Sequence, residues 1–158
     1  MTSPKPTKLY KILIANGVNL DLLGKREPDI YGSSTLLDLE AFLQEQRAVL
    51  LNAGLPRFDL SLFQSNDEGA FLSKLSEGWD GAIINAGAWT HTSLALADRL
   101  AALSLPFIEV HLSNLSRREP YRHHSYAAPH ARGVVFGAGF DSYSMALYGL
   151  LRLLGSPN

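Results

Sequence analysis

The chain of 158 residues has a hydrophobic fraction of 46%, a charged fraction of 18% and a formal net charge of −1. These values are typical of one globular domain with a buried core, and they disfavour nucleic-acid binding through a broadly basic face while allowing a local basic pocket. The sequence contains no cysteine, which excludes disulfides and thiolate metal sites and fits the reducing environment of the cytoplasm.

Apolar runs alternate with helical patterns in the order expected for a parallel, doubly wound α/β sheet. Strands are predicted over residues 9–15, 58–63, 81–84, 105–110 and 133–136. Helices are predicted after a capping box at Thr35, after a second box at Ser65, and over residues 92–104 and 142–154. A single domain, 9–154, is expected between a flexible N-terminal tail, 1–8, and a C-terminal tail, 155–158. The sequence shows no apolar run of the kind that a signal peptide or a membrane span requires.

Residues 16–33, called the lid segment below, separate the first predicted strand from the first predicted helix. Strand-to-helix connections are usually ~2–6 residues long, and much longer ones commonly close over a substrate. The lid segment contains two adjacent cations, Lys25 and Arg26, and a tyrosine, Tyr31. A close cation lowers the pKa of a tyrosine hydroxyl, which would make Tyr31 a usable base. The alternative is that Tyr31 packs the closed segment, with its hydroxyl bonded to the backbone.

Polar residues collect directly after the predicted strands. Asn16 and Asn19 follow the first strand, and residues 64–66, 85–91 and 109–114 follow the next three. In doubly wound sheets, ligands bind outside the carboxyl ends of the strands. The strand order does not follow from periodicity, but a flavodoxin-like order would bring these polar clusters to one edge of the sheet.

Two of these clusters contain a histidine that could take part in chemistry. Glu109 and His111 lie two residues apart in the fourth strand, so their side chains share one face. The carboxylate could orient the imidazole as a proton donor, although a structural hydrogen-bonded pair is the simpler interpretation of this spacing alone. Residues 85–91 either present a helix N-terminus to an anion or form a helix cap in which His91 is incidental.

The most basic stretch is residues 117–124, with the sequence RREPYRHH. Its arginines could bind a carboxylate, or the stretch could be a solvated face. His123 and His124 are adjacent and lack a third partner at metal-ligand spacing, so no metal site is predicted. The sequence shows no phosphate-binding loop and no nucleophile elbow, and no lysine sits at a strand end where a Schiff base would form.

Five motifs, in order, resemble those of type II 3-dehydroquinate dehydratase, the shikimate-pathway enzyme with a flavodoxin-like fold. They are NGVNLDLLGKREPDIYG (16–32), FQSNDEG (63–69), INAGAWTHTS (84–93), IEVHLSN (108–114) and REPYRHHSY (118–126). The resemblance covers about residues 10–154. Positions that depart from the usual family pattern are Val18, Asp21, Ala97 and Ser116.

The resemblance implies a three-layer α/β sandwich around a five-stranded parallel sheet, and a cofactor-free dehydration of 3-dehydroquinate to 3-dehydroshikimate through an enolate. It implies that Tyr31 is the base, that Arg26 activates it, and that Asn19 holds a water against the enolate oxygen. It also implies that His111 is the general acid and that Glu109 orients it. The residues implied to bind the substrate are Asn85, His91, Leu112 through its backbone, Ser113, Arg118, Arg122 and, from a neighbouring subunit, Asp98.

The resemblance further implies a homododecamer built of trimers. From the composition and hydropathy we expect a cytoplasmic protein with neither a nucleic-acid nor a membrane partner. Two other functions stay open. A non-catalytic flavodoxin-like binding domain predicts an acidic cluster or a flavin phosphate loop after the first strand, and the NGVN sequence of residues 16–19 is neither. The same reaction in quinate catabolism would use the same substrate and the same residues, so the sequence does not separate it from the biosynthetic role.

Overall fold

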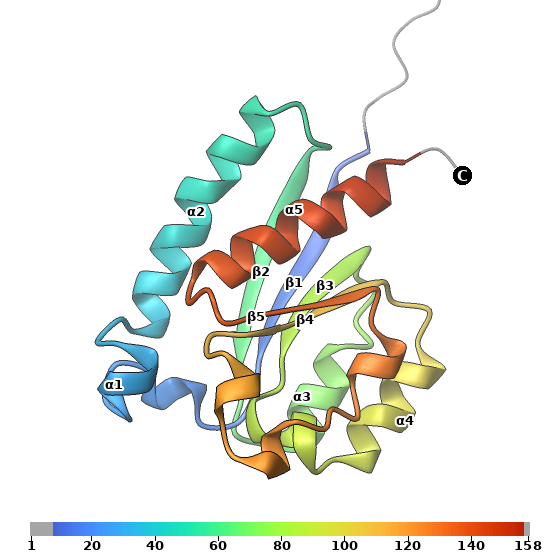
Figure 1. Cartoon of the computed structure of the whole chain (residues 1–158). Coiled ribbons are helices and arrows are strands. Elements are labelled where there is room, and N and C mark those ends of the chain that lie inside the picture. Colours follow the sequence, from blue (N-terminus) through green and yellow to red (C-terminus); the bar gives the residue numbers. More distant parts are fainter. Residues whose placement is uncertain (1–7, 157–158) are drawn as a thin grey trace, which may run out of the picture.

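The computed structural model describes residues 8–156, and its centre is one parallel sheet. The sheet has five strands in the order β2-β1-β3-β4-β5 (Figure 1). The strands are β1 (Tyr10–Asn16), β2 (Phe58–Gln64), β3 (Gly81–Asn85), β4 (Phe107–His111) and β5 (Gly133–Phe136). This is the flavodoxin-like order, in which the chain changes direction across the sheet between β1 and β3. The predicted fold is therefore confirmed.

Helices cover both faces of the sheet and make it the middle layer of three (Figure 1). One face carries α2 (Leu36–Asn52) and α5 (Asp141–Gly155), and the other carries α3 (Glu68–Lys74) and α4 (Leu94–Ala102).

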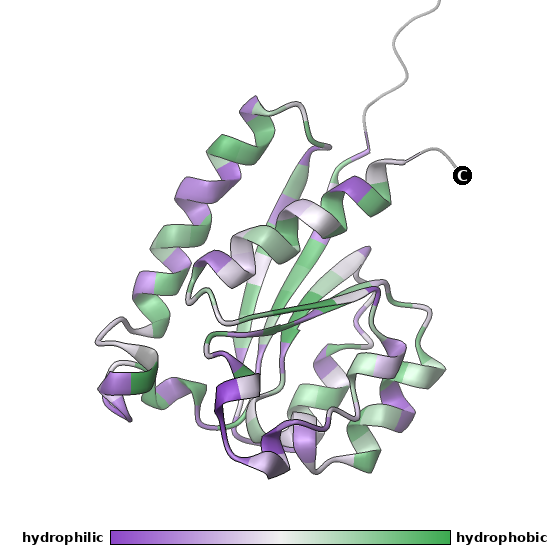
Figure 2. Cartoon of the chain, in the orientation of Figure 1, coloured by the Kyte–Doolittle hydropathy of each residue, from purple (hydrophilic) through white to green (hydrophobic). Residues whose placement is uncertain are grey.

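Successive side chains of β1 point to opposite faces, and this alternation produces two separate cores. Ile12 and Ile14 pack in the first core with Leu39 of α2 and Leu147 of α5. Leu13 points to the other face and packs in the second core with side chains of α3 and α4. Hydrophobic residues accordingly fill the strands, while hydrophilic ones gather in the loops at one end of the sheet (Figure 2).

Several predicted element boundaries need correction, and the strand ends shift by one or two residues, as in β4, predicted over 105–110. Helix α3 is capped by Asp67, whose carboxylate accepts from the Ala70 N–H at 2.7 Å, and not by Ser65. The predicted helix at 92–104 is shorter, because a 3-10 turn, η2 (Gly87–His91), precedes α4 and Ser93 caps that helix. Helix α5 includes Gly155, which was assigned to the tail. Lys8, also assigned to a tail, forms an ion pair with Asp80 at 2.7 Å, while residues 1–7 and 157–158 lie outside the described chain.

The lid segment is not a plain loop, since it contains a 3-10 turn, η1 (Leu20–Leu22), and a single helical turn, α1 (Pro28–Tyr31). Two of its non-glycine residues have left-handed backbone conformations, Asn19 with φ 65° and Glu27 with φ 43°. Similar short turns fill the polar stretch before β5, namely η3 (Leu115–Arg117), η4 (Pro120–Arg122) and η5 (Ala128–His130). Within residues 8–156, every helix is too short or too polar to span a membrane.

Candidate active site

The carboxyl ends of β1, β3 and β4 surround a cavity of about 110 Å³. The lid segment closes one side of this cavity, and the turns that follow β3 and β4 form the others. Most of the residues singled out from the sequence line it: Asn19, Arg26, Asn85, His91, His111, Leu112, Ser113, Arg118 and Arg122. The strand-end rule therefore located the cavity correctly.

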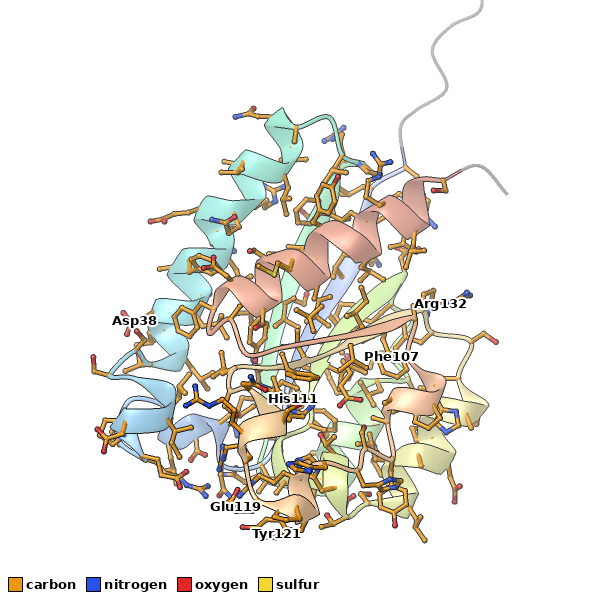
Figure 3. The ribbon with its side chains drawn as sticks, viewed as in Figure 1. Asp38, Phe107, His111, Glu119, Tyr121 and Arg132 are labelled. Atoms are coloured by element: carbon orange, nitrogen blue, oxygen red, sulfur yellow. The ribbon has the colours of Figure 1, made fainter. Side chains whose placement is uncertain are left out.

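Glu109 and His111 form a buried hydrogen-bonded pair on the face of β4 that packs toward α4. His111 Nε2 lies 2.6 Å from Glu109 Oε1, and the two residues are 6% and 1% exposed. Since a carboxylate can only accept, Nε2 carries the proton and the orientation of the ring is fixed. His111 stands at the carboxyl end of β4, with Phe107 at the opposite end of the strand (Figure 3).

The second oxygen of Glu109 is held by Ser125, a residue that the sequence analysis left without a role. Ser125 Oγ donates to Glu109 Oε2 at 2.8 Å and accepts from the backbone N–H groups of Ala127 and Ala128. Both carboxylate oxygens of Glu109 therefore have fixed partners. The imidazole of His111 is held by Glu109, which is held by Ser125, which is held by the backbone. The only sequence signal for Ser125 was its place inside the REPYRHHSY motif.

His91 lies beside this pair, with its ring stacked on that of His111 at a centroid distance of 6.0 Å and an angle of 20°. Its Nδ1 contacts the carbonyl oxygen of His124 at 2.7 Å. A carbonyl only accepts, so Nδ1 carries a proton. Burial lowers the pKa of His91 below its usual value, and the nearby His111 and Arg122 lower it further, against the opposing effect of the bond to His124. His91 is consequently neutral at pH 7 and presents the Nε2 lone pair as an acceptor.

Arginines give the cavity a basic wall. Arg118 is 7% exposed, and its Nη1 donates to Ser113 Oγ at 3.2 Å. Arg118 and Arg122 share the carboxylate of Glu119, at 3.3 and 3.0 Å. Figure 3 shows Glu119 and Tyr121 together on the segment that follows β4. The pKa of Glu119 falls to about 2, first because its own backbone N–H bonds the carboxylate and then because of the two guanidinium groups.

A buried tyrosine, Tyr143, links two asparagines beneath the cavity. Its hydroxyl accepts from Asn85 Nδ2 at 2.9 Å and donates to Asn16 Oδ1 at 2.6 Å. Asn85 Oδ1 in turn accepts from the Gly87 N–H at 3.2 Å. Burial raises the pKa of Tyr143 far above its usual value, so the hydroxyl stays protonated and can donate. The sequence predicts this helix over residues 142–154 but indicates no role for Tyr143.

Three predicted site residues stand apart from the lining. Glu109 lies behind His111 rather than at the cavity surface. Asp98 is exposed on α4, outside the cavity of its own chain. The backbone of Tyr31 ends α1, but its side chain lies outside the described part of the structure. Across residues 8–156, no group of three His, Asp or Glu side chains is arranged to hold a metal ion.

The fold and the cavity define a flavodoxin-like α/β protein with a buried glutamate–histidine pair beside an arginine-lined pocket at the topological switch point. Residues 10–151 match the model of the family described as dehydroquinase class II, and the chain belongs to this family.

Named relatives agree with this assignment over most of their length. A "3-dehydroquinate dehydratase" of Actinobacillus pleuropneumoniae is 49% identical over 142 residues, which are 88% of each chain. Another of the same name from a Synechococcus species is 50% identical over 146 residues, or 90% of this chain and 96% of the relative. Among solved structures, the type II dehydroquinase of Butyrivibrio crossotus has a TM-score of 0.81 and 38% identity, covering 93% of this chain and 98% of its own.

Proposed function

We propose that the chain is a 3-dehydroquinate dehydratase, a hydro-lyase that converts 3-dehydroquinate to 3-dehydroshikimate and water. The observation that carries this proposal is the buried Glu109–His111 pair, which opens into an arginine-lined cavity. Family membership and about 49% identity to proteins of that name support the same activity. The suggestion of a binding domain without catalysis is disfavoured, because such a domain has no need of an acid–base pair.

The reaction removes a proton next to the ketone, forms an enolate, and then expels a hydroxyl group as water. In our proposal, the phenolate of Tyr31 takes the proton, and the guanidinium of Arg26 stabilises the phenolate. Asn19 lines the cavity and holds a water against the developing enolate oxygen. The side chain of Arg26 is 43% exposed, and among the described residues its guanidinium forms an ion pair only with Glu27, at 3.3 Å, so its charge is available to a neighbour.

The departing hydroxyl group leaves as water after it receives a proton from His111. For this step His111 must start as the cation, and the carboxylate of Glu109 stabilises that cation at 2.6 Å. When the enolate re-forms the ketone, the electron pair moves into the new C=C bond and the C–O bond breaks. The product water carries away the proton that His111 gave. Tyr31 then releases the proton that it took and His111 regains one through solvent, so both groups return to their starting states.

The remaining lining residues suit the anionic, polyhydroxylated substrate. Arg118 and Arg122 supply positive charge, and Ser113 and the backbone of Leu112 supply donors for the carboxylate. Neutral His91 offers an acceptor to a substrate hydroxyl, and Asn85 contributes an amide at the same wall. These substrate contacts are proposals that rest on the lining of the cavity.

The direct test is to mix the purified protein with 3-dehydroquinate and follow the ultraviolet absorbance of the conjugated product. We expect turnover by the wild type, and nearly none by Tyr31→Phe or Arg26→Ala. Tyr31→Phe should still bind the substrate, because it loses only a hydroxyl. Substantial turnover by Tyr31→Phe would place the base elsewhere.

A Schiff-base route to the same product is testable separately. Among residues 8–156, no lysine lines the cavity. Borohydride added with substrate should therefore leave activity and protein mass unchanged. A covalent adduct on any lysine in the mass spectrum would contradict the enolate route.

We further propose a biosynthetic role in the cytoplasm and assembly into trimers that form a dodecamer. Asp98 supports trimers, because it is exposed on α4 beside Leu94, which is 63% exposed. From a neighbouring chain, this acid would stabilise arginines that repel one another. Light scattering should give a mass near twelve chains, and Asp98→Ala should weaken activity and trimer cohesion together. A fully active monomer would overturn the assembly proposal.

A further inference from the structure

The FQSNDEG motif at the end of β2 has no part in the proposed reaction, yet it contacts the start of the lid segment. Asn66 Oδ1 accepts from the backbone N–H of Asn19 at 2.8 Å. The same oxygen accepts from Gln64 Nε2 at 3.1 Å, and Gln64 Nε2 also donates to the Gly17 carbonyl at 3.2 Å. The side chains of Gln64 and Asn66 thus hold the start of the lid segment by hydrogen bonds, at Gly17 and at Asn19.

The orientation of both amides follows from the backbone groups that they contact. The Asn19 N–H can only donate, so the Asn66 atom that faces it is the oxygen. The Gly17 carbonyl can only accept, so the Gln64 atom that faces it is the nitrogen. Gln64 must therefore act as a donor, and Asn66 must act as an acceptor.

The opposite side of residues 17–19 is held by the end of β3. The Gly17 N–H donates to the Asn85 carbonyl at 2.7 Å. A Cβ at Gly17 would lie 2.5 Å from the Ala86 oxygen, and one at Gly87 would lie 2.6 Å from the Val18 oxygen. The first residues of the lid segment therefore lie between the ends of β2 and β3, with close backbone contact on one side and amide hydrogen bonds on the other.

This arrangement fixes an unfavourable backbone conformation. Asn19 has φ 65° and ψ 3°, a left-handed conformation that residues other than glycine seldom adopt and that asparagine tolerates better than most. The 3-10 turn η1 begins at the next residue, so the conformation of Asn19 sets the direction in which the lid segment leaves the sheet.

We propose that Gln64 and Asn66 are positioning residues that hold Asn19 in this conformation and so direct its side chain into the cavity. The role rests on the proposed function, because its effect on rate acts through the water that Asn19 holds. The pair also forms the fixed base from which the rest of the lid segment extends.

The donor and acceptor roles predict opposite outcomes for two nearly isosteric changes. Asn66→Asp keeps the acceptor oxygen for both bonds, so kcat should stay within about threefold of wild type. Asn66→Ala loses both bonds, and kcat should fall roughly tenfold, the factor expected for loss of the one bond that holds Asn19. Gln64→Glu replaces the required donor by an acceptor, and it should lower kcat at least as much as Asn66→Ala does. KM should change by less than about threefold in Asn66→Ala, because Asn19 acts on the developing charge.

Ser65→Ala is the matched control from the same turn. The Ser65 hydroxyl bonds only the backbone of Asp67 among the described residues, with its N–H at 2.9 Å and its carbonyl at 3.2 Å. This variant should keep wild-type kcat. Equal losses of kcat in Ser65→Ala and Asn66→Ala would indicate general damage to the turn and would overturn the proposal.

A double-mutant cycle tests whether the pair acts through Asn19. In an Asn19→Ala background, Asn66→Ala should lower kcat by no more than about twofold, because the side chain that it positions is gone. Fully additive losses would contradict the proposal.

Limited proteolysis supplies a readout that does not depend on turnover. Trypsin cleaves after Lys25 and Arg26, both exposed in the lid segment. Mass spectrometry should show faster cleavage there in Asn66→Ala than in wild type, and wild-type cleavage in Asn66→Asp. Unchanged cleavage in Asn66→Ala would overturn the positioning role. A wild type without turnover would contradict the proposed function separately, before any variant is compared.

Discussion

Replacing Tyr143 by phenylalanine removes one hydroxyl group from the buried layer beneath the cavity. Tyr143 is 1% exposed, and its partners Asn16 and Asn85 are 2% and 3% exposed. The change leaves Asn16 Oδ1 without its donor at 2.6 Å and Asn85 Nδ2 without its acceptor at 2.9 Å. A buried polar group left unsatisfied costs about 1–3 kcal/mol. For two such groups that relax in part, we expect the free energy of unfolding to fall by about 2–4 kcal/mol.

Thermal unfolding measures this loss. For a chain of this size, a loss of that magnitude corresponds to a fall in Tm of roughly 5–15 °C. Tyr148→Phe is the matched control, because Tyr148 lies in the same helix and is 46% exposed. The variant Tyr143→Phe should also raise KM, since Asn85 lines the cavity and loses one of its two fixed partners. A Tm equal to that of Tyr148→Phe would refute the argument that the Tyr143 hydroxyl holds the two asparagines.

Three further predictions concern single residues. His111→Ala should lower turnover by roughly 10²–10⁴-fold while exchange of the substrate α proton with solvent persists. Equal losses of turnover and of exchange would indicate that His111 is needed for enolate formation or for binding. Because the pKa of His91 is lowered in the folded state, its contribution to stability is present above pH 6.5 and is lost as the pH falls through the lower, folded-state pKa. Histidine NMR should give His91 a midpoint below 6.5, and a midpoint at or above that value would contradict the effect of burial on its pKa. Gly17→Ala, whose Cβ would meet Ala86 at 2.5 Å, should lose about 1–3 kcal/mol of stability in thermal unfolding, whereas Gly133→Ala meets nothing within 4 Å and should lose much less.

Local chemistry in the sequence predicted the sheet and the position of the cavity. The strands of a parallel sheet are buried on both faces and so are short apolar runs, and ligands bind outside their carboxyl ends. The capping box at Thr35 is present as predicted, with the Asp38 N–H and the threonine hydroxyl 3.3 Å apart. The Glu109 and His111 side chains share a face, as a spacing of two residues in a strand requires.

Competing local signals explain the error at the start of α3. Ser65 and Asp67 both belong to residue types that cap helices, and Ser65 has an acid three residues later. In the structure, the Ser65 hydroxyl bonds the Asp67 backbone and stabilises the turn, which leaves the Asp67 carboxylate to accept from Ala70. A pattern of residue types does not distinguish between two adjacent caps, because the turn geometry decides which side chain reaches the free N–H.

Long-range partners could not be predicted from the sequence. Tyr143 and Asn16 are 127 positions apart, and helical periodicity shows only that Tyr143 faces the core. Ser125 lies in a stretch without periodicity, where the Tyr126 N–H bonds the Thr90 carbonyl at 2.8 Å and brings the segment under β4. Both contacts depend on the packing of several elements, so they appear only once the sheet is assembled.

The two halves of the proposed reaction are held with very different rigidity, and this difference has a consequence for catalysis. His111 is fixed by Glu109, which Ser125 fixes in turn, so the proposed acid is already positioned before substrate binds. Arg26 is 43% exposed and stands beside Glu27, whose left-handed backbone marks a bend in the lid segment. In the proposed mechanism, formation of the enolate therefore depends on the position of the lid segment, whereas loss of water does not. Substitutions at Gln64 and Asn66, which hold the start of the lid segment, should therefore slow formation of the enolate. The same variants should keep the acid-catalysed loss of water intact.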